Sequence, residues 1–235
     1  MRGCLFVLVL AAAILGVAAW FGAAPLADTV IASALDGSGF HAQTSTITAT
    51  ADPPVRLLLG HADKVTIDGT GVTWRTFQAA RLQLTLGDVD LFGRSAGSIE
   101  GTITGAVLRA NDPGAPPTAD VTLDGTGAAA QATIRVSGSA VDRLVRARFT
   151  SSFGVAVTST SLVAPDTLRI DASGTTVEGR LRIDDSGALV LVTGLGTAEV
   201  FRFDASFPLR LTAVRVAGTD LELDGTLDAD TLLGG

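Results

Sequence analysis

Hydrophobic and polar positions follow three successive patterns along the chain of 235 residues. Residues 3–26 form an uncharged apolar run directly after Arg2. Residues 27–35 then place apolar side chains at helical spacing, with Asp28 suited to cap a short helix. From Thr44 onward apolar and polar residues mostly alternate, which is the period of a strand with one buried face. The pattern predicts a membrane-length segment, a short helix and a strand-rich domain.

The alternation is clearest in residues 81–92, where Leu82, Leu84 and Leu86 share one face. The phase of the alternation changes at Gly87, which predicts a β-bulge at that point. Further alternating segments, bounded by glycine- and proline-rich turns, occupy residues 64–74, 98–108, 121–127 and 132–136 and most of the chain after residue 154. So many short strands with few helices predict a mostly antiparallel architecture.

Two apolar features interrupt the strands. Residues 139–150 have the spacing of an amphipathic helix, with Ser139 as the predicted N-cap and Arg143 and Arg146 on the polar side. The apolar side of this helix is formed by Val141, Leu144, Val145 and Phe149. A second apolar cluster, predicted to form one or two helical turns, consists of Leu57, Leu58 and Leu59.

The N-terminal run can be interpreted in three ways. Cys4 to Ala24 is long enough to span a bilayer as an uncleaved anchor, because a helix rises about 1.5 Å per residue. A signal peptide cleaved near Ala24 and a buried helix of a soluble protein are the alternatives. Because Arg2 favours a cytoplasmic N-terminus, both an uncleaved anchor and a cleaved signal peptide would export the rest of the chain. We therefore expect a transmembrane or signal segment over residues 1–26 and an extracytoplasmic domain over residues 27–235.

Composition narrows the classes of partner and cofactor. The formal net charge of −7 makes nucleic acid an unfavourable partner. The single cysteine, Cys4, lies within the apolar run, so the domain is expected to fold without disulfides. Two histidines and no cysteine outside this run do not supply the usual ligand set for zinc or an iron cluster. No metal or other cofactor is predicted.

One segment matches a catalytic motif. Residues 93–97 match the G-x-S-x-G pattern of a serine hydrolase around Ser95. That pattern requires a helix directly after the serine and a histidine to accept its proton. A strand-like segment follows instead, and the two histidines, His41 and His61, both precede the motif. We therefore interpret the motif as a hairpin turn and predict no catalytic residues.

The two apolar clusters allow two interpretations. Their seven residues can be ordinary core, or they can line an elongated apolar groove that holds an acyl chain between helix and sheet. In the second interpretation the lipid-binding residues are Leu57, Leu58, Leu59, Val141, Leu144, Val145 and Phe149. Neither interpretation requires catalytic groups.

Several of these segments together resemble the LmeA-like family of actinobacterial envelope proteins. The resemblance covers roughly residues 25–230 and rests on KVTIDGTGVTW, ARLQLTLGDVDLF, SIEGTITGAVL, GRLRIDDSGALVL and FPLRLTAVRVAGTDLELDGTL. The corresponding ranges are Asp63–Val72, Leu82–Leu91, Ser139–Phe149 and Leu209–Gly225. Two apolar segments typical of the family are reduced here to DPPVRLLLGHAD and VFRFDASFPLRL.

The resemblance implies binding of membrane phospholipid, without enzyme activity, in maintenance of envelope lipids or lipoglycans. We expect an α+β, mostly β fold: a long curved antiparallel sheet with one or two helices on its concave face, held at the outer side of the cytoplasmic membrane. An envelope scaffold or protein-interaction module without a lipid groove is the alternative. Lipid identity, protein partners and oligomeric state are left open by the sequence.

Overall fold

The structure is a computed structural model that describes residues 39–74, 77–107, 118–203 and 209–228. The predicted anchor over residues 1–26 and the short helix expected over residues 27–35 lie outside these ranges. Among the described residues, no helix combines the length and the apolar character required to cross a bilayer.

The described chain is mostly strand. A nine-stranded sheet contains β1 (Phe40–His41), β2 (Thr44–Thr50), β3 (His61–Trp74), β4 (Phe77–Asp90), β5 (Ser95–Val107), β6 (Thr118–Thr126), β7 (Ala129–Val136), β13 (Leu209–Ala217) and β14 (Asp220–Leu227). A five-stranded sheet contains β8 (Val157–Val163), β9 (Thr167–Ala172), β10 (Thr175–Ile183), β11 (Leu189–Thr193) and β12 (Gly196–Phe201). The described helices are α2 (Val55–Leu58) and α3 (Gly138–Phe153).

Every strand pair in both sheets is antiparallel, so the predicted mostly β, antiparallel class is confirmed. The nine-stranded sheet is the long sheet that was predicted, but a second sheet was not foreseen, because strands β8–β12 form a sheet of their own. The free edge of β7 is taken by β14, which pairs in turn with β13. With that edge occupied, β8 cannot extend the larger sheet, and β8–β12 fold as a separate meander.

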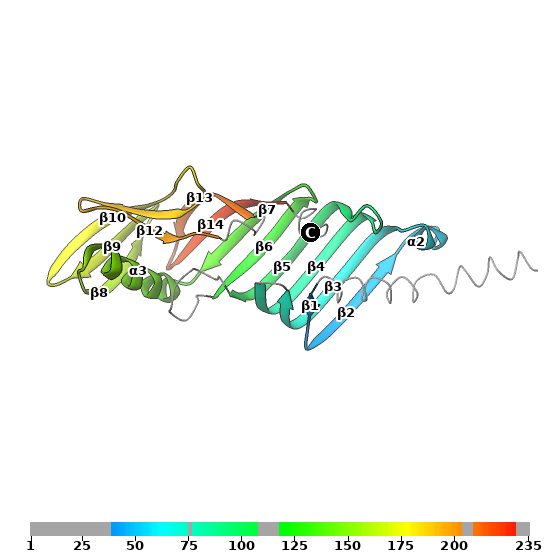
Figure 1. Cartoon of the computed structure of the whole chain (residues 1–235), viewed down its shortest axis with the longest axis horizontal. Helices are drawn as coiled ribbons and strands as arrows, with labels where there is room; N and C mark the ends of the chain where they lie inside the picture. Colours follow the sequence, from blue (N-terminus) through cyan, green and yellow to red (C-terminus); the bar gives the residue numbers. More distant parts are fainter. Residues whose placement is uncertain (1–38, 75–76, 108–117, 204–208, 229–235) are drawn as a thin grey trace, which may run out of the picture.

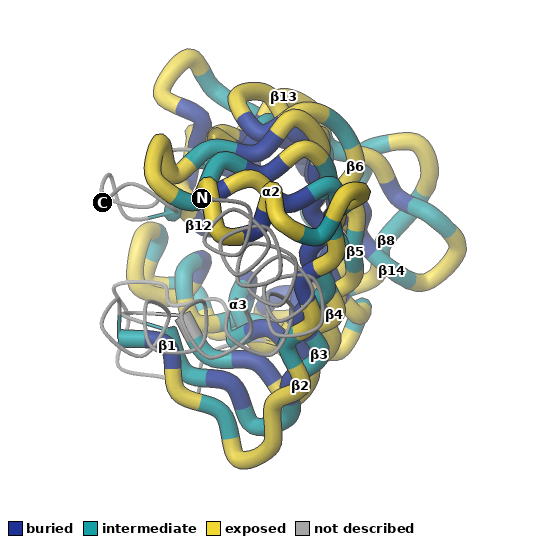
Figure 2. Tube along the Cα trace, turned by 90° about the vertical axis from the view of Figure 1, so that its right-hand side faces the viewer, coloured by how far each residue is buried: buried dark blue, intermediate teal, exposed yellow. Residues whose placement is uncertain are grey.

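The molecule is elongated along the direction in which strands are added (Figure 1). The β2–β3 edge and α2 lie at one end, and α3 with the five-stranded sheet lies at the other (Figure 1). Seen along this long axis, the larger sheet traces an arc, with α3 and β12 on its inner side (Figure 2). The sheet is therefore a trough whose long axis runs across the strands.

The phase change in the leucine-rich strand does not come from a β-bulge. β4 keeps an uninterrupted register with β3 and β5 past Gly87, so that part of the prediction is wrong. Ala62 and Val65 on β3 and Ala96 and Ile99 on β5 show the same change of phase and stay paired with Val89 and Leu86. The buried side therefore switches at the same place in all three strands. In β4 the switch occurs at Asp88, whose backbone has a φ of 49°.

The predicted helix is confirmed as α3, but it begins at Gly138. Ser137, not Ser139, is its N-cap, because the Ser137 side chain accepts a hydrogen bond from the Ala140 N–H. Gly154 ends the helix in the left-handed conformation that favours glycine. α3 packs mainly against β8 and β12 and also contacts β14. It thus lies where the two sheets meet rather than over the centre of the trough.

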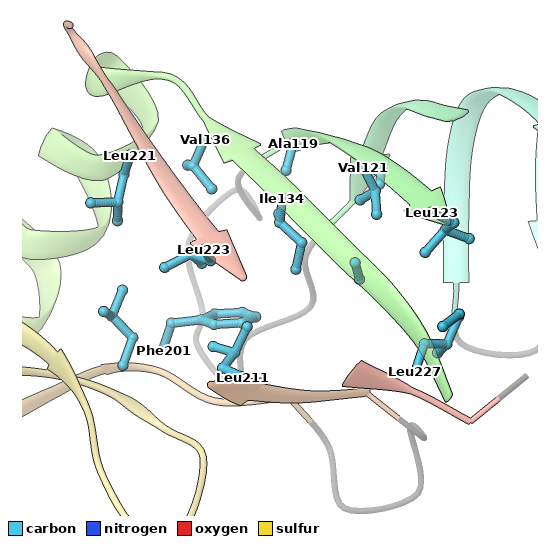
Figure 3. Packing of buried hydrophobic residues seen from close by; sticks show 14 of the residues in the cluster. Ala119, Val121, Leu123, Ile134, Val136, Phe201, Leu211, Leu221, Leu223 and Leu227 are labelled. Atoms are coloured by element: carbon cyan, nitrogen blue, oxygen red, sulfur yellow. The ribbon is translucent and has the colours of Figure 1, made fainter. Parts of the chain in front are cut away.

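One hydrophobic core joins the two sheets. Phe201 at the end of β12 lies beside Leu211 of β13 and Leu223 of β14, on the inner side of the larger sheet (Figure 3). All three side chains are almost fully buried. The α3 end of the trough is therefore filled by protein side chains.

Candidate functional site

The inner side of the nine-stranded sheet is apolar along its whole length. Cross-strand partners form continuous rows, since side chains facing one side of neighbouring strands lie next to each other. One row runs through Ile47, Ile67, Leu84, Gly101, Leu123, Ala132, Gly225 and Leu211. We call this side the apolar face; among the described residues, its rows contain no charged side chain.

The dimensions of the apolar face follow from strand spacing. Eight strands, from β2 to β13, contribute to the row above. Neighbouring strands lie about 4.8 Å apart, so the face extends roughly 34 Å along the trough. The hydrocarbon of one bilayer leaflet is about 15 Å deep. The apolar face is therefore long enough to lie against the acyl chains of a phospholipid.

Exposure varies along the apolar face. Phe201, Leu221 and Leu223 at the α3 end are almost fully buried. Leu84 and Ile103, near the centre of β4 and β5, are only partly buried against the core. α2 makes its main contacts with β3, and α3 makes its contacts with β8, β12 and β14. On β4 and β5, Leu84 and Ile103 are thus the partly exposed positions of the apolar face, whereas Leu82, Leu86 and Ile99 are buried.

The outer side of the same sheet is polar and carries ion pairs. Arg81 donates to Asp68 at 2.9 Å, and this hydrogen bond holds the pKa of the Asp68 carboxyl below its usual range. Glu222, although buried, accepts hydrogen bonds from Arg135 and Arg215, and the bond from Arg135 is the main cause of its lowered pKa. These ion pairs therefore lie on the side of the sheet that faces away from the trough.

Trp74 stands at the end of β3, on the apolar face. Its ring meets that of Phe40 edge-to-face, with centroids 6.3 Å apart. Its Nε1 atom is buried and has no hydrogen-bond partner. Because an unpaired buried donor costs about 1–3 kcal/mol, a ligand oxygen reaching this nitrogen would be favourable. Trp74 is the only tryptophan in the described ranges.

The seven residues predicted to line a lipid groove fall into two separate groups. Leu57 is buried against β3, whereas Leu58 and Leu59 are exposed. The remaining four lie on α3 at the other end of the trough, where Val141, Val145 and Phe149 are buried and Leu144 is partly buried. Five strand spacings separate β3 from β14, or roughly 24 Å. The two groups thus flank the apolar face and do not form one contact site.

The residues around Ser95 are not arranged for nucleophilic catalysis. Ser95 follows the turn at residues 91–94 and begins strand β5, so the predicted hairpin turn is confirmed. Asp90 pairs with His61 on one side and with Ser95 on the other, which places β4 between the serine and the histidine. Two strand spacings amount to roughly 10 Å, far beyond the reach of about 3 Å that proton transfer needs.

Sequence reasoning missed two features of the site. The first is Ile103. Its strand was predicted, but its partial exposure depends on the packing of other elements, which the sequence pattern does not contain. The second is Phe92, which is 76 % exposed in the turn between β4 and β5. The sequence analysis placed Phe92 at the end of the alternating segment 81–92, directly before the predicted turn at residues 93–97. That position was a signal for an exposed aromatic side chain.

Comparison with known proteins gives one match. A family model described as LmeA-like phospholipid-binding matches residues 18–226, which is most of the chain. No curated protein and no solved structure matches the chain.

Proposed function

The chain belongs to the LmeA-like phospholipid-binding family, and we propose that it binds phospholipid acyl chains against the apolar face of its nine-stranded sheet. The observation that carries this proposal is the continuous apolar row across eight strands, with Leu84 and Ile103 partly exposed at its centre. Each methylene that leaves water contributes about 0.8 kcal/mol. Such binding requires no nucleophile or metal ion, so we infer a non-enzymatic function.

The polar end of the lipid has a candidate contact at Trp74. An ester or phosphate oxygen beside the β3 end of the apolar face would pair the buried Nε1–H, which has no partner in the protein. In this arrangement the acyl chains extend along the trough over Leu84 and Ile103. The lipid is held mainly by burial of apolar surface, and Trp74 orients it.

We further infer that the domain works at the outer side of the cytoplasmic membrane, in maintenance of envelope lipids or lipoglycans. The uncharged run of residues 3–26, preceded by Arg2, supports a tether with the domain outside. If the run is cleaved near Ala24, the same domain is a soluble carrier. Isolating the protein from the membrane fraction and sequencing its N-terminus distinguishes the two forms.

The binding proposal is tested with two substitutions at adjacent positions of β5. Ile103→Asp places a charge on the apolar face, whereas Thr102→Asp places the same charge on the exposed polar side. Full-length protein is purified in detergent, washed extensively, and analysed by mass spectrometry for retained phospholipid. We expect stoichiometric phospholipid in the wild type and Thr102→Asp, and at least a tenfold loss in Ile103→Asp. Absence of phospholipid from the wild type, or equal retention in both variants, would contradict the proposal.

A further inference from the structure

Exposed large apolar side chains are concentrated at one end of the trough. The described ranges contain five such residues. Three lie in α2 or directly after it, and a fourth lies in the turn between β4 and β5. Their exposed fractions are 40 % for Val55, 45 % for Leu58, 62 % for Leu59 and 76 % for Phe92. We call these four residues the α2 tip. The fifth, Leu195, lies in the turn between β11 and β12.

The α2 tip is held in place by the fold. Leu57, on the same short helix, is buried against β3 and fixes the side of α2 that faces away from water. The ring of Phe92 lies directly on Gly60, where any added Cβ would overlap it. The Leu91 N–H donates to the Gly60 carbonyl at 2.8 Å, which joins the turn to the end of α2. The exposure of these side chains is therefore a fixed feature of the surface.

The carboxylate of Asp90 closes the turn that carries Phe92. Its Oδ1 accepts hydrogen bonds from the N–H groups of Phe92, at 3.0 Å, and Gly93, at 2.8 Å. The bond from Gly93 is the main cause of the lowered pKa of Asp90. Asp90 is thus ionised at neutral pH and uses its charge within the turn, while the aromatic ring beside it points outward.

The position of the α2 tip identifies its partner. α2 lies at the extreme end of the long axis (Figure 1), beside the β2–β3 edge of the sheet. The described chain enters along this same edge but at its other end, since β1 pairs with Thr73 and Trp74, whereas α2 precedes His61 at the start of β3. Only residues 27–39 separate this entry from the uncharged run, and 13 residues span at most about 45 Å. β3 spans roughly 45 Å between these two ends. An anchored run therefore brings the α2 tip to the bilayer surface when the β2–β3 edge of the sheet faces the membrane.

We propose that the α2 tip inserts into the outer leaflet of the bilayer and brings the β3 end of the apolar face against it. This inference rests on the proposed phospholipid-binding function and on the tether. Four exposed side chains offer at most a few hundred Å², less than the roughly 800 Å² per partner of a stable protein interface. A tethered domain needs only weak insertion, because the tether raises the local concentration to the millimolar range.

Docking in this orientation explains why an apolar helix and an exposed phenylalanine occur together at one end. Leucine and phenylalanine side chains are favourable in the interfacial and acyl region of a leaflet. The charged neighbour Arg56 forms an ion pair with Asp63, so its charge is compensated beside the apolar side chains. In this orientation the β3 end of the apolar face lies next to the leaflet that supplies the lipid.

The test measures the depth of the α2 tip in a membrane. Cys4, the only cysteine, is replaced by serine in the full-length chain, and a single environment-sensitive fluorophore is attached at Leu59→Cys. The matched control is Thr175→Cys, an exposed position of β10 in the five-stranded sheet. Both proteins are reconstituted into phosphatidylcholine vesicles containing phosphatidylglycerol and nitroxide-labelled lipid.

We expect at least a twofold quenching of the fluorophore at position 59 by nitroxide-labelled lipid, and none at position 175. A water-like signal at both positions would overturn the inference. Leu59→Asp combined with Phe92→Asp separates this inference from the proposed function. This double variant is expected to retain phospholipid in detergent and to take it up from vesicles at least tenfold more slowly. Unchanged uptake contradicts docking, whereas loss of lipid from the wild type contradicts the binding function.

Discussion

The phenyl ring of Phe92 lies against Gly60, and this contact joins the β4–β5 turn to the end of α2. Gly60 has a φ of 81°, in the left-handed region, so its lack of a side chain is required both by the backbone and by the ring. The pair therefore determines where the most exposed aromatic side chain of the described protein is held.

Gly60→Ala is expected to destabilise the protein by about 2 kcal/mol or more. Left-handed backbone in alanine costs about 1–2 kcal/mol, and displacement of Phe92 adds to it. Gly174→Ala is the matched control, because Gly174 also has a φ of 81° but no atom lies within 4 Å of its would-be Cβ. Urea denaturation of both variants measures the difference. Equal destabilisation would show that Phe92 does not rest on Gly60.

The ion pairs of Glu222 make the folding stability of the protein depend on pH. Its pKa is lowered in the folded protein, first by the hydrogen bond from Arg135 and then by Arg215. Its contribution is therefore complete above the ordinary glutamate pKa of about 4.3 and is lost as pH falls through the lower folded value. Glu222→Gln should be less stable at pH 7 and lose less further stability on acidification below pH 5. Denaturant midpoints at a series of pH values test this, and parallel curves for both proteins would contradict it.

The position of Phe201 between the two sheets leads us to expect that they unfold together. Its ring lies between the sheets beside Leu211 and Leu223 (Figure 3). Phe201→Ala should lower the free energy of unfolding by about 3–5 kcal/mol in one transition. Leu195→Ala, at an exposed turn position of the same sheet, should change it by less than about 0.5 kcal/mol. Calorimetry that resolves two transitions, with only one moved by Phe201→Ala, would show two independent units.

The sequence predicted those parts of the fold that depend on local periodicity. The alternation of Leu82, Leu84 and Leu86 located β4 and its buried side, and helical spacing located α3. The division into two sheets was missed, because it depends on β14 pairing with β7 some 90 residues earlier, for instance Leu223 with Ile134. Apolar patterning shows that a strand has a buried side but does not select its neighbour.

The same distinction applies to the site. Leu57 and the α3 residues were recognised as apolar clusters, yet their separation along the trough follows from strand order, which the sequence pattern does not contain. The lipid role of these seven residues stays a prediction. The apolar face of β4 and β5 emerges only from the registers, which align Leu84 with Gly101 and Leu82 with Ile103.

The most direct test of the central claim uses Trp74 as a reporter on the apolar face. Trp20→Phe leaves Trp74 as the only tryptophan of the full-length chain. The protein in detergent is titrated with phosphatidylcholine brominated on its acyl chains, which quenches nearby tryptophan fluorescence. The control moves the indole by one position to the opposite side of β3, in Trp20→Phe, Thr73→Trp, Trp74→Phe.

We predict saturable quenching of Trp74 by about one equivalent of brominated phospholipid, with at least fivefold weaker quenching of the tryptophan at position 73. Equal quenching at both positions, or none at Trp74, would show that phospholipid does not lie on the apolar face.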